Sequence, residues 1–143
     1  MHTEDTPSEV GAQADAPRAT DQQADHGDGI VVRTVLIAGT AWDGAAYSSY
    51  PDASPQLTVL RFSIPPHSSL PWHRHVVPNA AFLIEGELTL EDRESGATRV
   101  FGAGEAFGES VGNVHRGVTG QRGAEVVVTY AGAPGIPLSI PVD

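Results

Sequence analysis

Histidines at two places in the sequence are suited to metal binding. His73 and His75 stand one residue apart in PWHRHVVPN (71–79), and His115 follows in GEAFGESVGNVHRGVT (104–119). In a β-strand alternate side chains share a face, so His73 and His75 would point the same way with about 6.6 Å of rise between them. Two imidazoles at that spacing can converge on one ion, about 2.0–2.1 Å from each ligating nitrogen. An isolated HxH pair can equally be solvated, and His115 is the candidate for a third ligand.

Several other chemistries are excluded by residues that the sequence lacks. The chain has no cysteine, which rules out disulfides, thiolate nucleophiles, iron–sulfur clusters and cysteine-type zinc sites. All eight basic residues are arginine, so the chain cannot form a Schiff base through lysine. The sequence shows no basic patch with interleaved aromatic residues, and we therefore expect no nucleic-acid partner.

The acidic character of the chain is concentrated at its N-terminus. Residues 1–29 carry seven acidic residues, one arginine and no apolar run, a composition typical of a disordered tail. The length of 143 residues leaves room for one domain, which we expect over residues 30–143. We recognise no secretion signal and no run of 18 apolar residues, and we expect a soluble cytoplasmic protein without a membrane partner.

From residue 30 onward the sequence predicts short β-strands and few helices. Segments rich in β-branched residues are bounded by glycine and proline, and none keeps a helical period. The expected strands are residues 30–39, 56–64, 80–92, 97–101, 102–110, 114–118 and 124–131. Strands spaced in this way are typical of a sandwich or barrel. The C-terminal GAPGIPLSIPVD (132–143), with three prolines, is predicted to be a strap across the outside.

With the histidines set among these strands, the sequence resembles the cupin family, whose metal site is built from two motifs. The first, G(x)5HxH(x)3–4E(x)6G, is matched at His73, His75 and Gly86, and the second, G(x)5PxG(x)2H(x)3N, at Gly104, Gly112 and His115. The family's remaining motif positions hold different residues here, namely His67, Asn79, Ser110 and Thr119. The resemblance covers about residues 30–131. It implies an all-β, jelly-roll-like barrel, the double-stranded β-helix, with one divalent metal ion held by the three histidines.

Asn79 stands where the family usually has a glutamate ligand, and this changes the expected charge of the site. An amide oxygen adds no negative charge and is a weak ligand, so we expect a neutral three-histidine centre with open positions. A centre of this kind favours an anionic, bidentate ligand such as an enolate. The ligand type suits Fe²⁺, Mn²⁺, Ni²⁺, Co²⁺, Cu²⁺ and Zn²⁺, and the resemblance described next favours Fe²⁺.

Glu109 is the predicted acidic partner of the centre. Small three-histidine cupins, including the β-diketone-cleaving dioxygenases, have a glutamate six residues before the last histidine, near the metal and not on it. Glu109 stands at that position. The resemblance implies that it accepts the outer N–H of a ligating histidine or acts as a base. An ion pair with Arg116 and direct ligation of the metal are the alternatives.

Three residues are candidates for a substrate pocket: Asn79, Trp72 and Phe82. Aromatic residues in so small a barrel are more commonly part of the core, and this alternative stays open for both. Tyr47 and Tyr50, in AAYSSYP, could belong to a loop that covers the barrel mouth.

The resemblance implies a dioxygenase-like oxidoreductase that acts on a small chelating enolate or hydroxy-carbonyl substrate, with Glu109 as its catalytic residue. It also implies a homodimer. Two alternatives remain, because a fold does not select a reaction. The chain could be a non-catalytic module that binds metal or a small molecule, or a redox-neutral metal-dependent isomerase or cyclase.

Overall fold

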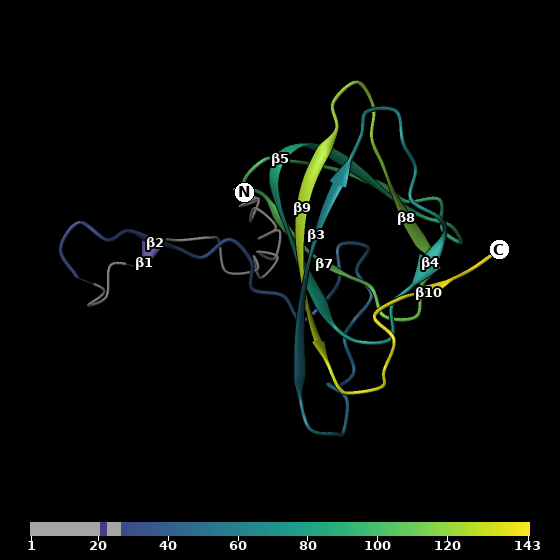
Figure 1. Cartoon of the computed structure of the whole chain (residues 1–143), viewed down its shortest axis with the longest axis horizontal. Coiled ribbons are helices and arrows are strands. Elements are labelled where there is room, and N and C mark those ends of the chain that lie inside the picture. Colours follow the sequence, from purple (N-terminus) through teal and green to yellow (C-terminus); the bar gives the residue numbers. More distant parts are fainter. Residues whose placement is uncertain (1–20, 23–26) are drawn as a thin grey trace, which may run out of the picture. The chain divides into compact units, whose positions relative to one another are not determined.

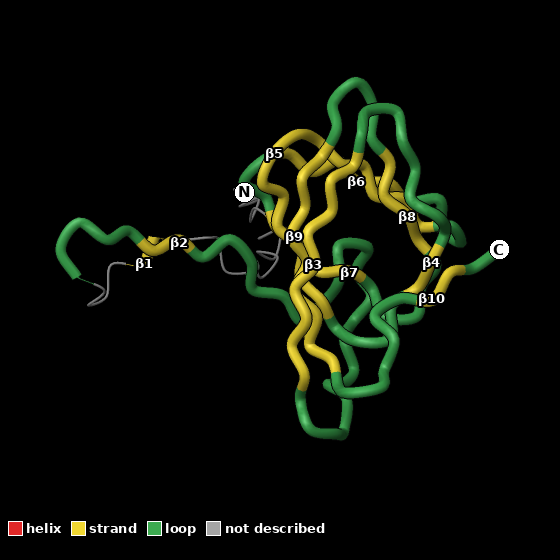
Figure 2. The backbone as a smooth tube through the Cα atoms, in the orientation of Figure 1, coloured by secondary structure: helices red, strands yellow, loops and turns green. Residues whose placement is uncertain are grey.

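The computed structural model describes residues 21–22 and 27–143, and these residues form strands and no helix (Figure 2). Accordingly, no helix in the described part of the chain is long and apolar enough to span a membrane. Most of the predicted disordered tail, residues 1–29, lies outside the described residues. The chain divides into two units, Met1–Ile37 and Ala38–Asp143.

The first unit contains one short antiparallel pair, β1 (Asp21–Gln22) with β2 (Val32–Arg33). The sequence predicted a strand over residues 30–39, and only Val32 and Arg33 form one. Val35 and Ile37 are exposed. A run of β-branched residues favours extended backbone, but a strand also needs a neighbour for its hydrogen bonds.

The second unit is an eight-stranded antiparallel sheet in the order β10-β4-β8-β5-β9-β3, with β6 and β7 also paired to β5. Its strands are β3 (Gln56–Ile64), β4 (His73–Arg74), β5 (Asn79–Asp92), β6 (Thr98–Gly102), β7 (Ala106–Glu109), β8 (His115–Val118), β9 (Ala124–Gly132) and β10 (Ile140–Pro141). The sheet curls, so that β3, β9 and the start of β5 face β8, β4 and β10 (Figure 1). The all-β, barrel-like fold predicted from the sequence is confirmed.

Strand β5 makes the curl because it belongs to both halves of the sheet. Its first part pairs with β7 and β9, and its second part pairs with β6 and β8. The register shifts between Leu83 and Glu85, and Gly86 follows with a φ of 86°. A Cβ at Gly86 would collide with the carbonyl oxygen of Gly123. The strand therefore turns where only glycine fits.

The core lies inside the curled sheet, on its inner face, and both halves of β5 contribute side chains to it. The bulge changes which residues of β5 point inward, so Leu83 before it and Leu90 after it are both fully buried. On β9, Val126, Val128 and Tyr130 alternate inward. Burial of each large apolar side chain contributes about 1.5–3 kcal/mol. The predicted C-terminal strap contains β10, in which Pro141 pairs with His73.

Candidate metal centre

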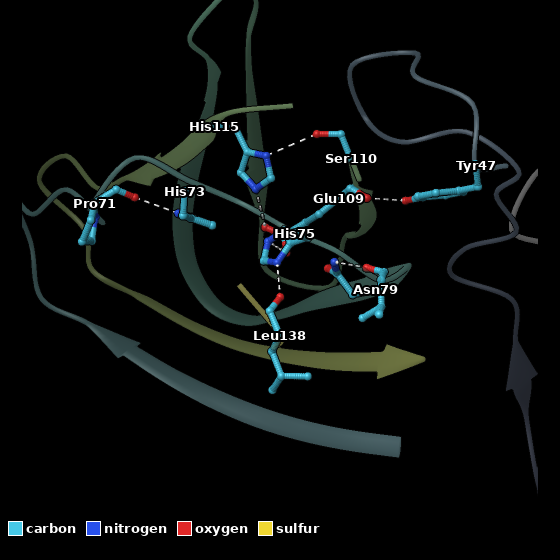
Figure 3. A network of polar contacts seen from close by, with 10 residues as sticks. Tyr47, Pro71, His73, His75, Asn79, Glu109, Ser110, His115 and Leu138 are labelled. Carbon is cyan, nitrogen blue, oxygen red and sulfur yellow. Dashed lines mark hydrogen bonds and ion pairs between the residues drawn. The ribbon is translucent and has the colours of Figure 1, made fainter. Parts of the chain in front are cut away.

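Strand ends bring together the four residues of the candidate metal centre. His73 begins β4 and His115 begins β8, and the two are register partners in that antiparallel pair. His75 follows β4 and forms a bridge with Val111. Glu109 is the last residue of β7. In Figure 3 the rings of His115 and His75 both point toward the Glu109 carboxylate.

The four side chains are close enough to share one ion. One ligand atom from each of His73, His75, Glu109 and His115 lies within 4.8 Å of all the others. The imidazole ring centroids are separated by 4.7 Å for His73 and His115, 4.9 Å for His73 and His75, and 5.0 Å for His75 and His115. His75, Glu109 and His115 are buried, and His73 is partly buried. This group could hold a metal ion.

Hydrogen bonds on the outer side of each ring set its orientation. The Nδ1 atoms of His73 and His75 bond to backbone carbonyl oxygens, which only accept, so these nitrogens carry the hydrogen. The Nε2 lone pairs of the neutral rings then face the other residues of the candidate metal centre. Partners of this kind orient metal-binding histidines and fix the tautomer. They are the carbonyl oxygens of Pro71 for His73 (2.7 Å) and of Leu138 for His75 (2.8 Å), and Ser110 Oγ for His115 (3.2 Å).

The Nε2 atoms of His75 and His115 face the Glu109 carboxylate, and no donor forms a hydrogen bond to them within the described residues. Glu109 Oε2 lies 2.8 Å from His75 Nε2, and Oε1 lies 3.6 Å from His115 Nε2. The short distance suits an ion pair, and both Nε2 atoms are buried without a hydrogen-bond partner among the described residues as long as the rings are neutral. Buried acceptors that face one another need a cation between them, either a proton or a metal ion. The residues therefore fit a divalent metal of the kind that imidazole and carboxylate bind.

Charge interactions shift the pKa values of the clustered groups in opposite directions. Burial by itself disfavours the charged form of Glu109, but contacts with His115 and His75 outweigh it and hold the pKa of this carboxyl below its ordinary value. Burial likewise opposes charge on His75, yet the Glu109 carboxylate raises the pKa of this imidazole. Burial lowers the pKa of His73 despite its bond to a backbone carbonyl. A carboxylate and an easily protonated imidazole thus meet where a cation fits.

The loop before β3 holds Glu109 in place through its backbone. The Tyr47 hydroxyl donates a hydrogen bond to the carbonyl oxygen of Glu109 at 2.7 Å, and the Trp42 amide donates one to Gly108. A Cβ at Gly108 would collide with the Tyr47 hydroxyl. Burial, with the charges of Glu109 and Asp43, raises the pKa of Tyr47 to about 12, so its hydroxyl stays a donor at neutral pH.

A cavity of about 170 Å³ lies beside the four residues, inside the curl of the sheet. Its polar lining comes from His73, His75, Glu109, Tyr130 and Ser139. The rest of the lining is largely apolar and includes Phe62, Ile64, Leu70, Leu88, Leu90, Phe107, Val126 and Val128. The cavity holds far more than one water molecule, for which about 10–15 Å³ suffices. Because His73, His75 and Glu109 cluster together and Tyr130 lies beside His75, the cavity has one polar end and a largely apolar body.

Glu109 does not accept the outer N–H of His73 or His75, which was one of the roles expected for it. The outer N–H groups of the histidines bond to other residues, and Glu109 faces the Nε2 atoms. Nor does Glu109 pair with Arg116, whose Nε donates to Glu91 at 2.8 Å. Glu109 thus lies with the three histidines in a group that could hold one ion, as direct ligation, one of the alternatives, requires.

The three residues suggested for a substrate pocket do not line the cavity. The Trp72 ring lies 4.2 Å from the Arg116 guanidinium carbon. Phe82 follows the inward-facing Ala81 on β5, so strand alternation turns it outward, and it is 38% exposed. Asn79 is buried next to Glu109, and its Oδ1 has no hydrogen-bond partner among the described residues.

Sequence reasoning missed three contributors to the site. Tyr130 lines the cavity, and the alternation of AEVVVTYA placed it on the same face as Val126 and Val128. Ser110, which bonds His115, occupies a motif position where the family has proline, and that substitution was the available signal. The Leu138 carbonyl had no signal, because it reaches His75 from 63 residues away.

The chain is similar in fold to several known proteins. No protein-family model matches the chain, and no curated protein matches its sequence. Among solved structures, the polyketide cyclase RemF from Streptomyces resistomycificus is 26% identical with a TM-score of 0.54, over 64% of this chain and 63% of that one. The DMSP lyase DddQ from Ruegeria pomeroyi DSS-3 is 21% identical with a TM-score of 0.55, over 69% and 47%. An oxalate oxidase is 23% identical with a TM-score of 0.51, over 60% and 46%.

These matched structures are cupins. The chain has the cupin fold. It covers less than two thirds of the length of each of the three proteins. They are a cyclase, a lyase and an oxidase, so the cupin fold does not by itself select the reaction.

Proposed function

We propose that the chain is a metal-dependent enzyme in which His73, His75, His115 and Glu109 hold one divalent ion at the polar end of the cavity. The observation that carries the proposal is the pair of buried Nε2 atoms without partners, on His75 and His115, that face the Glu109 carboxylate. The three outer hydrogen bonds support it, because they orient each ring toward the common point before any ion arrives.

When bound, the ion would polarise a substrate oxygen as a Lewis acid and, if redox-active, exchange electrons with the substrate. The chain itself would orient the substrate and exclude water. The largely apolar lining of the cavity would limit the water around the reacting end. A carboxyl with a lowered pKa accepts a proton poorly, which favours a metal-binding role for Glu109 over that of a general base.

The reaction that we propose first is dioxygenase-like oxidation of a small enolate or hydroxy-carbonyl molecule, with Fe²⁺ as the favoured ion. It is supported by the resemblance to small three-histidine cupins and by the position of Glu109 six residues before His115. The second candidate is a redox-neutral cyclase or isomerase. The match to the cyclase RemF, at 26% identity, supports this candidate.

Oxygen uptake distinguishes the two candidates. Protein purified without added metal is first assayed for bound metals by elemental analysis. It is then reconstituted anaerobically with Fe²⁺ and screened against β-diketones, flavonols and hydroxy-ketones. O2 consumption that scales with iron content supports the dioxygenase-like candidate, and substrate conversion without O2 by the Zn²⁺ form supports the cyclase or isomerase candidate.

The same preparation tests the metal site. His67→Asn is the matched control for variants that lose a candidate metal-binding histidine, because His67 is exposed in a loop outside the centre. Its backbone has a φ of 54°, a conformation that asparagine tolerates. The control should bind metal like the wild type. Failure of the wild type to bind any of the six expected divalent ions would overturn both catalytic candidates.

A further inference from the structure

A row of polar side chains crosses the inner face of the sheet next to the candidate metal centre. Asn79 on β5 is the register partner of Glu109 on β7 and of Tyr130 on β9. Cross-strand partners share a face, and all three residues are buried, with exposed fractions of 9% for Glu109, 6% for Asn79 and 2% for Tyr130. The row thus runs from the metal centre to Tyr130.

Tyr130 stands where it can contact both the centre and a molecule in the cavity. Its ring centroid lies 5.8 Å from that of His75, and the residue lines the cavity together with Glu109. Its hydroxyl has no hydrogen-bond partner among residues 27–143, in contrast to that of Tyr47, which bonds to Glu109. The hydroxyl oxygen is not among the fully buried polar atoms that lack a partner, so it is accessible to a molecule in the cavity that Tyr130 lines.

We propose that Tyr130 is a substrate-binding residue, whose hydroxyl donates a hydrogen bond to an oxygen of a molecule held between it and the metal centre. A phenol is a donor at neutral pH, since its ordinary pKa is near 10. Tyr130 therefore complements an oxygen on the substrate, whereas Glu109, which only accepts when ionised, repels one unless a cation lies between them.

The same cavity indicates the class of substrate. Its polar lining comes from His73, His75, Glu109 and Tyr130, together with Ser139, and its other walls are largely apolar. A molecule that fits has two oxygen atoms at one end, one for the metal and one for Tyr130, and a small apolar body. This inference rests on the proposed metal-dependent function.

Two hydroxamates that share a chelating head test the inference. Benzohydroxamate carries a phenyl ring and acetohydroxamate a methyl group, and both are titrated by calorimetry into the Zn²⁺-loaded protein. Wild type should bind benzohydroxamate at least about tenfold more tightly, because the apolar walls bury its ring. Tyr130→Phe should weaken benzohydroxamate binding about fivefold to tenfold, the usual effect of one lost hydrogen bond.

Zn²⁺ affinity and thermal stability separate binding from a structural role. Tyr130→Phe should leave both unchanged, because the hydroxyl has no partner within the described chain. Tyr50→Phe is the matched control, since Tyr50 is exposed and outside the cavity, and it should bind both probes like the wild type.

The outcomes distinguish this inference from the function on which it rests. Equal probe affinities for wild type and Tyr130→Phe, with Zn²⁺ bound to both, would overturn the role of Tyr130 alone. A lower melting temperature with unchanged probe affinity would assign the hydroxyl a structural role instead. Absence of Zn²⁺ binding to the wild type would overturn both the inference and the proposed function.

Discussion

The two ends of the cavity are built from strands of one sheet, but from different parts of those strands. At the polar end, His73 and His115 begin their strands and Glu109 ends its own. In the apolar body, residues such as Leu90 and Val128 lie within their strands. The side chains of both sets point to the inner face of the sheet, so the two sets do not differ in the direction of their side chains.

The difference lies in what surrounds each residue. Within a strand, the backbone groups form hydrogen bonds to the neighbouring strands, so side-chain packing alone decides which residue type fits a position. At a strand end, the adjoining loops still have free carbonyl groups, and those of Pro71 and Leu138 bond to His73 and His75. Polar chemistry is therefore placed where backbone groups can orient it. Changes at the polar end should alter binding, and changes in the apolar body should alter stability.

Loss of a histidine from the polar end should have the largest effect. His115→Ala removes one of four ligands, and we expect it to abolish stoichiometric Zn²⁺ binding in calorimetric titrations. Because His115 is fully buried, His73→Ala provides a second variant at a less buried position. Its Zn²⁺ affinity should fall by more than the roughly 10–100-fold that is typical for loss of a residue that only hydrogen-bonds a ligand. Tight binding by both variants would show that the metal lies elsewhere.

A truncation in the apolar body should have the opposite pattern. Leu90 is fully buried, and Leu90→Ala should lower the free energy of unfolding by about 2–5 kcal/mol, since it removes packing and leaves a cavity. Leu57→Ala, at a 73% exposed position on β3, should change it by less than about 0.5 kcal/mol. Urea unfolding measures both. A large loss of Zn²⁺ affinity in folded Leu90→Ala would break the separation between the two ends.

Removal of the charge of Glu109 should weaken the centre without dismantling it. Glu109→Gln keeps the shape of the side chain but removes its negative charge, and we expect Zn²⁺ affinity to fall about 10–100-fold, corresponding to roughly 1.4–2.7 kcal/mol. Glu87→Gln is the matched control at an exposed position of β5. An unchanged affinity in Glu109→Gln would return this residue to the role, expected from the sequence, of a group near the metal and not on it.

The contrast between local and distant partners also explains how far the sequence could predict the molecule. Strand alternation and turn residues are local signals, and they predicted the all-β fold. The spacing of His73 and His75 is equally local, and the family motif added His115 across the chain. The structure brings these histidines together with Glu109.

Features that depend on distant neighbours were beyond such reasoning. The strand predicted over residues 30–39 had the right composition but pairs only at Val32 and Arg33. The side of the rings on which Glu109 lies depends on which atoms bond to the outer nitrogens. One of those is the carbonyl of Leu138, and a backbone atom leaves no trace in residue type. Trp72 and Phe82 were chosen for their aromatic character, although alternation alone would have turned Phe82 outward.

The smallest effect that we predict is a displacement of the pH dependence of metal binding. A ligating imidazole must be neutral, and Glu109 raises the pKa of His75, so Zn²⁺ affinity should fall as the pH drops through this raised pKa. In Glu109→Gln the cause of the increase is gone and burial, which lowers the pKa, remains. The midpoint of the loss should therefore move to lower pH, as measured by Zn²⁺ titrations between about pH 5 and 8. An unmoved midpoint, equal to that of Glu87→Gln, would mean that His75 and Glu109 are not electrostatically coupled at the polar end.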